Sequence, residues 1–554
     1  MLKELKQHLQ DNALADRLRT WGPPRKGCYV KILQTPNIWG QPMDRSVMNG
    51  VNASMNELKD SIVRVMTRTT SILDITSLDP PRGCTPNGIF WDALREGLTK
   101  MSQSGGKKTV RFLFGWPFDR LHIGPVGFGD RGGPGSHRRP HHERFRKALA
   151  GFINTLRNPP DVYYGIYSNS AGSAFNHAKI ICNDNGGAVV GGHNMYDADY
   201  NQYPPVHDLS VEVWGPVAYD VKNFAKYLWD YGGSTNVDVG RSVSGQERSN
   251  ESWTTFFWNQ AKQSVSSTWL MGWKLNDGEW ESMSYSTMRQ AAAAGDYVDA
   301  AELGRTFDIS LPNFHEAKVM VVGRMGGACG TADKKNTSHL MKDFLIKNAA
   351  TRLDFSHQDL TAMDLAAGIN TTMAHWTCEA IATAMKAKPK LRVNVVVSGP
   401  YGSGKMDGYT NNSNGPQNAA DFIMYYTREK AWNYASKSVW NRLRVAPFRF
   451  THDYVENEPY WDDAADEKED CEGALAERGV LKAVGNHSKL TLVDRQTFVV
   501  GSDNHYPHGL AEINLVMEGD IIKALLREYW DPLMKYSLPH SLTQWQASHK
   551  WSTL

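Results

Sequence analysis

Apolar residues along the chain follow helical and strand-like spacings in alternation, and one order of elements occurs twice. Residues 55–69 repeat apolar positions at helical spacing, whereas 109–115 is a short apolar run typical of a buried strand. The first series comprises helix 55–69, strand 71–78, helix 89–103, strand 109–115 and helix 141–158, and the second comprises helix 341–350, strand 351–360, helix 376–388, strand 391–399 and helix 428–443. Each series continues through a short strand and a hairpin to a closing strand–helix unit, at 208–231 and at 511–533.

This repeated order predicts the fold class and the domain organisation. Alternating strands and helices predict an α/β protein whose mostly parallel or mixed sheet is covered by helices on both faces. A repeat this long exceeds a solenoid period and indicates two similar domains. The polar run at 234–252 is the best boundary, so we assign residues 1–245 to an N-terminal domain and 246–554 to a C-terminal domain.

Composition changes this picture little. The 61 basic and 59 acidic side chains give a net charge of +2, so bulk charge does not indicate a nucleic-acid partner. No apolar run approaches the roughly 18 residues that span a bilayer. The N-terminus lacks the apolar block of a secretory signal. Leu2, Leu5, Leu9 and Leu18 instead predict an amphipathic helix packed on a domain surface.

The chemistry is concentrated in one pattern, H-x-K-x4-D-x6-G-x-x-N, which occurs twice. The first copy, from His177 to Asn194, reads HAKIICNDNGGAVVGGHN, and the second, from His487 to Asn504, reads HSKLTLVDRQTFVVGSDN. Taken singly, each residue has a structural explanation, since strand histidines are often structural and turns favour aspartate. Two copies with identical spacing, at equivalent points of a repeated domain, indicate a shared function instead.

Each motif predicts a β-hairpin that presents three polar groups to one anionic centre. In the first, His177 and Lys179 lie two residues apart and therefore share a strand face, and Asp184 begins the turn. The glycine-rich end of the returning strand, at Gly191, lets the backbone approach a ligand closely and delivers Asn194 to the same place. The second motif repeats this arrangement with His487, Lys489, Asp494, Gly501 and Asn504. An ammonium and an amide suit phosphate oxygens, and an imidazole suits nucleophilic or acid–base work.

On these residues the chain resembles the two-motif members of the phospholipase D superfamily, and most of all the bacterial phospholipases D. The second motif, ending Gly501-Ser502-Asp503-Asn504, fits the family pattern, whereas the first departs at Gly192, where the family usually has serine. The resemblance implies two α/β/α sandwich domains in a pseudo-twofold arrangement, with the active site at their interface.

The resemblance also implies a mechanism and a residue set. One histidine attacks phosphorus to form a phosphohistidine and the other protonates the leaving alcohol; the residues alone leave the choice open, and the family assigns His177 as nucleophile and His487 as acid. The family places an acid just beyond each motif, here Asp208 and Glu512. The expected site comprises catalytic His177, Lys179, His487, Lys489, Asp208 and Glu512, phosphate-binding Asn194, Asn504 and Ser502, and structural Asp184, Asp494, Gly191, Gly192 and Gly501. No metal or cofactor is expected, because the lysines and amides can balance the phosphoryl charge.

The leading hypothesis is a phospholipase D that converts glycerophospholipids to phosphatidic acid and a head-group alcohol, with transfer to other alcohols. Its partners would be a phospholipid surface and water or a small alcohol, not nucleic acid, and the protein would be a monomer. The resemblance favours secretion, with the cytoplasm as alternative. Trp39, Trp116 and Trp461 lie in loop-like sequence and are candidate lipid contacts. The alternatives are a nuclease of the same superfamily and an antibacterial lipase effector without a signal peptide.

Overall fold

The computed structural model covers the whole chain and places fourteen segments well enough to describe. These are residues 1–13, 20–81, 88–115, 138–169, 175–201, 205–234, 268–295, 312–324, 336–360, 376–399, 416–427, 437–452, 485–505 and 510–542. All fourteen residues of the expected site lie within them.

Strands and helices alternate through the described residues. The strands are β1 (Arg25–Thr35), β2 (Ile72–Ser77), β3 (Thr109–Gly115), β4 (Asp161–Asn169), β5 (Ile180–Asn183), β6 (Gly187–Gly191), β7 (Asp208–Trp214), β8 (Thr268–Asn276), β9 (Glu279–Ser282), β10 (His315–Arg324), β11 (Arg352–His357), β12 (Arg392–Val397), β13 (Leu443–Pro447), β14 (Lys489–Val493), β15 (Thr497–Gly501) and β16 (Glu512–Gly519). The helices are α1 (Leu2–Asn12), α2 (Met48–Thr67), α3 (Ile89–Gln103), α4 (Arg138–Ile153), α5 (Asp197–Tyr200), α6 (Pro216–Ser234), α9 (Tyr285–Ala293), α10 (Thr337–Asn348), α12 (Trp376–Ala387), α13 (Pro416–Thr427), α14 (Lys437–Trp440), α15 (Ile521–Leu525) and α16 (Asp531–Ser537), with short turns η2 (Arg45–Val47), η6 (Leu526–Trp530, a π-helical turn) and η7 (Leu538–His540).

The strands form one hydrogen-bonded sheet whose centre is the antiparallel pair β1–β10. Outward from β1 the order is β7, β6, β5, β2, β3, β4, and outward from β10 it is β16, β15, β14, β11, β12, β13. In both directions a hairpin is followed by three parallel strands. The predicted mixed α/β fold with a large sheet is thus confirmed.

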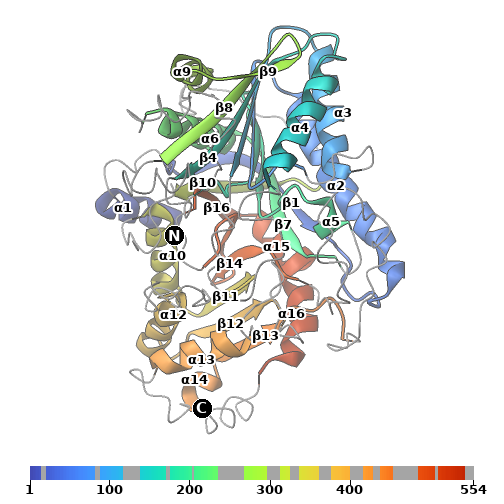
Figure 1. The fold of residues 1–554 in the computed structure, drawn as a ribbon. Coiled ribbons are helices and arrows are strands. Elements are labelled where there is room, and N and C mark those ends of the chain that lie inside the picture. The colour runs from blue at the N-terminus through green and yellow to red at the C-terminus, as the bar shows by residue number, and fades with distance from the viewer. Residues whose placement is uncertain are drawn as a thin grey trace, which may run out of the picture.

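Helices cover both faces of this sheet (Figure 1). Helices α2, α3 and α4 pack on one face of β2–β4, and α6 and α9 lie on the opposite face. Further along the sheet, α1, α10, α12 and α13 share a core with β11 and β12. Leu2, Leu5 and Leu9 are buried in that core, so the predicted amphipathic helix forms and packs as expected. Leu18 lies outside the described residues.

Another cluster of buried apolar side chains joins the two halves of the chain. It contains Val190 and Val213 from the first half together with Leu490, Ile513 and Ile521 from the second. Burying apolar side chains of both halves in one cluster stabilises the halves against each other. The residues around the central strands are therefore held by both halves at once.

Two features lie beyond the sequence predictions. The predicted boundary at 245/246 falls outside the described residues, and the next described strand, β8, pairs with β4 of the first half. The predicted helix at 428–443 is described only from residue 437, as α14, while α13 precedes it at a place where no helix was predicted.

Among the described helices, none combines the length and the apolar character needed to cross a membrane.

Candidate active site

Each motif forms the predicted hairpin, β5–β6 in the first half and β14–β15 in the second. The turns fit their sequence, because Gly186 has φ 79° and Asp494 and Arg495 have φ 50° and 54°, the left-handed values that a tight turn needs. One detail was wrong: His177 and Lys179 precede β5, and His487 precedes β14, so neither histidine lies within a strand of its hairpin.

Both motif histidines are attached instead to the opposite half of the chain. The His177 amide donates to the Ala511 carbonyl at 2.9 Å, and the His487 amide donates to the His207 carbonyl at 2.7 Å. Isolated parallel bridges join the residue before each histidine to the same two partners. Each histidine therefore leaves its own hairpin and lies beside the residue that precedes an acid of the other half.

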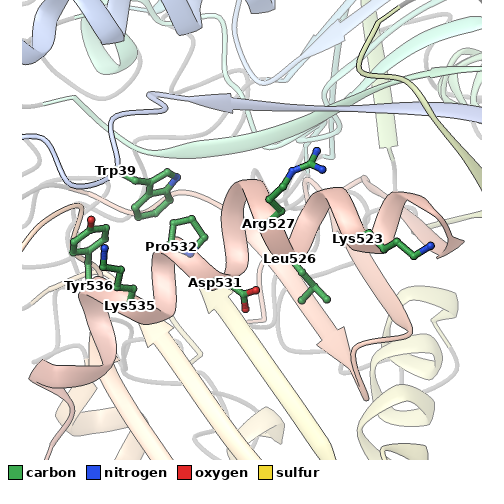
Figure 2. Close-up of a pocket in the computed structure, with 8 residues that line it drawn as sticks. All are labelled: Trp39, Lys523, Leu526, Arg527, Asp531, Pro532, Lys535 and Tyr536. Atoms are coloured by element: carbon green, nitrogen blue, oxygen red, sulfur yellow. The ribbon is translucent and has the colours of Figure 1, made fainter.

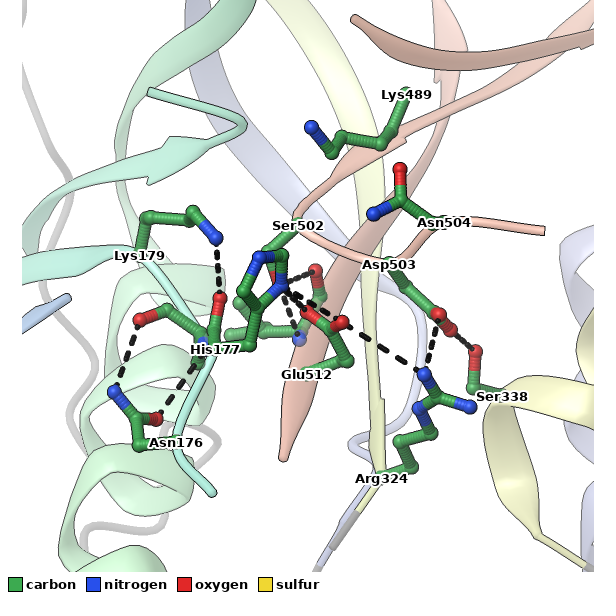
Figure 3. Close-up of polar contacts among 12 residues, drawn as sticks. Asn176, His177, Lys179, Arg324, Ser338, Lys489, Ser502, Asp503, Asn504 and Glu512 are labelled. Carbon is green, nitrogen blue, oxygen red and sulfur yellow. Dashed lines mark hydrogen bonds and ion pairs between the residues drawn. The ribbon is translucent and has the colours of Figure 1, made fainter. Parts of the chain in front are cut away.

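The two acids are consequently crossed between the motifs. His177 Nδ1 lies 2.9 and 3.0 Å from the Glu512 carboxylate oxygens, and His487 Nδ1 lies 2.6 Å from Asp208 Oδ2. The sequence predicted both acids, but it did not predict that each acid would contact the histidine of the other motif. Figure 3 shows the His177 ring, just before β5, facing the Glu512 carboxylate at the start of β16. A carboxylate at Nδ1 fixes the tautomer, so Nε2 is the nitrogen turned away from the acid.

The two lysines take equivalent positions. Lys179 Nζ donates to the His177 carbonyl at 2.8 Å, and Lys489 Nζ donates to the His487 carbonyl. Burial lowers the pKa of Lys179 well below its ordinary value, against the opposing effect of Glu512. Burial likewise lowers the pKa of Lys489 to about 8. Both ammonium groups thus lie in a dry site where an anion would stabilise their charge.

Burial also lowers the pKa of both imidazoles well below the usual value, and the two lysines add to this effect. Arg324 lowers the pKa of His177 further, whereas the nearby Asp503 raises it. Burial raises the pKa of Glu512 to about 7. Burial and the two lysines therefore favour the neutral form of both rings, and a further anionic group facing them would favour the protonated form.

The motif aspartates have a structural role that extends beyond the turn. Asp184 accepts from the Thr70 and Ser71 amides at 2.9 and 2.7 Å, and Asp494 accepts from three successive amides starting at Ala350, at 2.7 to 2.8 Å. These hydrogen bonds hold the pKa of both carboxyls below the usual value, against burial. Each hairpin turn is thereby fixed to the segment that leads into β2 or β11.

The motif glycines are required by close packing between strands. A Cβ on Gly191 would lie 2.3 Å from Ser210 Cα, and one on Gly501 would lie 2.3 Å from the Ile513 carbonyl oxygen. A Cβ on Gly192 would lie 2.0 Å from Asp208 Oδ1. We expected these glycines to let the backbone approach a ligand, whereas the contacts show the approach of β6 to β7 and of β15 to β16.

The remaining motif residues surround the two acids. The Ser502 hydroxyl donates to Glu512 Oε2 at 2.5 Å, so its described contact is with the acid. Asn194 and Asn504 are both buried, and their backbones are held by Tyr200 and Lys342. Their predicted contact with phosphate stays a prediction.

A buried charge network beside Glu512 was missed by sequence reasoning. Asp503 Oδ1 lies 2.9 Å from Lys342 Nζ. It also lies 3.1 Å from an Arg324 guanidinium nitrogen, and the same guanidinium lies 3.7 Å from Glu512 Oε1 (Figure 3). The two cations hold the pKa of Asp503 well below its usual value, against burial. The one available signal was Asp503 itself, an acid inside the motif. Arg324 and Lys342 come from β10 and α10, far away in sequence.

The position equivalent to Asp503 in the first motif is His193, and its described hydrogen-bond partners are two neutral hydroxyl groups. His193 Nδ1 lies 2.7 Å from Ser210 Oγ, and Nε2 lies 2.6 Å from Thr35 Oγ1. Burial lowers the pKa of His193 to about 4. The two halves thus place different electrostatic environments around the two histidine–acid pairs.

A surface pocket lies between Trp39 and the C-terminal helical segment (Figure 2). Its walls include Trp39, Tyr536, Lys523 and Arg527, which line one side of the helical segment formed by α15, η6 and α16. The Trp39 ring is half-buried, and its centroid lies 5.7 Å from that of His207, the residue before Asp208. The other two candidate lipid contacts, Trp116 and Trp461, lie outside the described residues.

Fold and site together define a mixed α/β protein with two histidine–carboxylate pairs, each completed by the opposite half of the chain. No family model matches the chain. A phospholipase D from Streptomyces antibioticus is 23% identical over 519 residues, covering 91% of this chain and 80% of that protein. The solved structure of a phosphatidylserine synthase from Haemophilus influenzae Rd KW20 has a similar fold, with a TM-score of 0.51 and 11% identity, covering 99% of this chain and 93% of the other. In sequence and in fold, the chain is thus similar to enzymes of phospholipid metabolism, and these similarities support a relationship to the phospholipase D superfamily.

Proposed function

We propose that this protein is a phospholipase D, which breaks the distal phosphodiester bond of a glycerophospholipid and transfers the phosphatidyl group to water or an alcohol. The observation that carries the proposal is the pair of buried imidazoles, each oriented at Nδ1 by a carboxylate from the other half. The relative with 23% identity is named a phospholipase D, and the structural neighbour is named for phosphatidylserine synthesis. Both names support an enzyme that acts on phospholipids.

We also propose that the two halves are pseudo-twofold related domains with the active site between them. The matching strand order on either side of β1–β10 supports this arrangement, and so do the crossed histidine–acid pairs. The pairing of β8 with β4 favours a division later than residue 245, after α9. On this proposal neither half contains a complete site.

In the first step of the proposed reaction, Nε2 of His177 attacks phosphorus. The bond from phosphorus to the head-group oxygen breaks, its electron pair stays on that oxygen, and Nε2 of His487 supplies the proton. The products are the head-group alcohol and a phosphatidyl group on His177. Since burial disfavours the protonated imidazole of His487, we infer that it gains its proton when the anionic phosphate binds.

In the second step the roles of the imidazoles reverse. His487, now neutral, takes a proton from water, whose oxygen attacks phosphorus while the bond to His177 breaks. This releases phosphatidic acid and restores both rings, and an alcohol in place of water gives a phosphatidyl alcohol. Lys179 and Lys489, with the amides of Asn194 and Asn504, would balance the charge that develops on the phosphoryl oxygens.

Electrostatics support His177 as the nucleophile. A nucleophilic imidazole must be neutral, and Arg324 lowers the pKa of His177 in addition to burial and the two lysines. The effects on His487 come from burial, the lysines and His177. The additional cation beside His177 therefore favours the free base there, which leaves His487 to carry the proton.

The test uses the full-length protein with phosphatidylcholine vesicles and a primary alcohol, and in parallel with single- and double-stranded DNA. We expect phosphatidic acid and phosphatidyl alcohol, and we expect both products to disappear in His177→Ala and His487→Ala. His452→Ala, which changes an exposed histidine, is the matched control and should keep wild-type rates. Cleavage of DNA with lipid left intact would refute the lipid assignment and favour a nuclease.

A further inference from the structure

The two catalytic acids are each contacted by a hydroxyl, but the hydroxyls come from different places in the chain. Glu512 Oε2 accepts from Ser502 at 2.5 Å, and Ser502 is part of the second motif. Asp208 Oδ2 accepts from the Tyr200 hydroxyl at 2.9 Å, and Tyr200 lies six residues after the first motif ends. The same Asp208 oxygen lies 2.6 Å from His487 Nδ1.

The reason for the different source is steric. Gly192 occupies the place in the first motif that Ser502 occupies in the second. A Cβ at Gly192 would lie 2.0 Å from Asp208 Oδ1 and 2.8 Å from its carboxyl carbon. A serine there would displace the carboxylate from His487, so the hydroxyl has to reach Asp208 from another direction.

Tyr200 is well placed to supply it. The side chain is fully buried at the end of the short helix α5, and its ring centroid lies 5.0 Å from that of His193. Its hydroxyl also accepts a hydrogen bond at 3.1 Å from the Asn194 amide, the last residue of the motif. One hydroxyl thus links the end of the first hairpin to the acid that orients the histidine of the second.

We propose that Tyr200 is a positioning residue that replaces the motif serine on the Asp208 side and sets the orientation and proton affinity of His487. This inference rests on the proposed function, in which His487 protonates the leaving alcohol. A hydroxyl that donates to Asp208 takes up part of the carboxylate charge, so less charge is available to stabilise a protonated His487. Removing the Tyr200 hydroxyl should therefore make the His487 imidazolium a weaker acid. It should also leave the Asp208 carboxylate with one hydrogen bond fewer to hold its orientation.

Tyr200→Phe tests this, since it removes the hydroxyl and keeps the ring. With soluble dihexanoyl phosphatidylcholine, whose choline leaving group needs a proton, we expect kcat to fall about 10- to 100-fold with KM changed less than about threefold. With dihexanoyl phosphatidyl-p-nitrophenol, whose leaving group departs without a proton, the loss should be less than about threefold. A residue that only maintained the fold would lower both rates alike.

The pH profile gives a second readout, for which Ser502→Ala is the matched control. An acid must be protonated, so a higher His487 pKa moves the alkaline limit of activity upward in Tyr200→Phe. A nucleophile must be deprotonated, so a higher His177 pKa moves the acidic limit upward in Ser502→Ala. The two hydroxyl deletions should therefore shift opposite limbs of the same profile.

Site-specific 3-fluorotyrosine at position 200 covers the case in which Tyr200→Phe does not fold. Its more acidic phenol donates more strongly, so the alkaline limit should move downward. Equal losses on both substrates, or an alkaline limit unmoved by both changes, would overturn the positioning role. If the wild-type protein released neither alcohol, the proposed function would fail, and the role of Tyr200 with it.

Discussion

The imidazole of His207 offers a prediction whose size can be worked out from its surroundings. Four aromatic rings enclose it, with centroids at 5.7 Å for Trp39, 4.8 Å for Phe448, 5.6 Å for Phe450 and 5.3 Å for Tyr529. Burial among these rings lowers the pKa of His207 to about 3. We therefore expect His207→Phe, which fills the same space with a ring that cannot titrate, to change how stability depends on pH.

The sign follows from linkage. The folded pKa lies below the unfolded value of about 6.5, so the unfolded state binds the proton first and stability is lost as pH falls. Between pH 7 and pH 5 the unfolded histidine becomes protonated while folded His207 stays neutral, which costs about 2 kcal/mol of unfolding free energy. Other buried histidines add to the acid sensitivity of both proteins and cancel in their difference.

The measurement is urea unfolding of wild type and His207→Phe at pH 7 and pH 5. The variant should lie within about 1 kcal/mol of wild type at pH 7 and should gain about 2 kcal/mol relative to it at pH 5. Phe448→Leu, which disturbs the same ring cluster without removing a titrating group, should shift stability equally at both pH values. An unchanged difference between wild type and His207→Phe would refute the reasoning.

Three further changes test the site. Gly192→Ala should lower the rate at least tenfold, because its Cβ would displace Asp208, and should lower unfolding free energy by about 1–3 kcal/mol through overpacking; kinetics and urea unfolding on one preparation separate the two effects. Asp494→Ala should lower unfolding free energy by about 1–3 kcal/mol, because three amides lose their acceptor, and denaturant titration measures it. Arg324→Met should move the acidic limit of the rate profile upward, since losing that cation raises the pKa of His177, the proposed nucleophile.

Local pattern was sufficient to predict much of the fold. The spacing over 89–103 and the apolar run at 109–115 predicted α3 and β3 with the bounds that the structure shows. Both hairpins followed from turn chemistry flanked by β-branched residues, because register and turn type are decided within a few residues. The β8–β9 hairpin escaped prediction, since its place is decided by pairing with β4, about a hundred residues earlier.

The crossing of the two acids could not be read from either motif. Sequence proximity would pair His177 with Asp208, which follows it by about thirty residues, and His487 with Glu512. The actual partners depend on contacts between halves, through the bridges at Ala511 and His207. A pattern within one half carries no record of such contacts, so they appear only when the whole fold is assembled.

On the proposed mechanism, the crossing also explains how the two motifs can differ while both take part in the reaction. Each histidine receives its backbone anchor and its acid from the other half, so each half changes the imidazole that it does not carry. The first half, with Gly192 and Tyr200, shapes Asp208 and hence His487, whereas the second half, with Ser502 and Arg324, shapes Glu512 and hence His177. Different protonation of two like residues therefore needs no difference in the H-x-K pattern itself. It arises from what each half places around the other half's histidine.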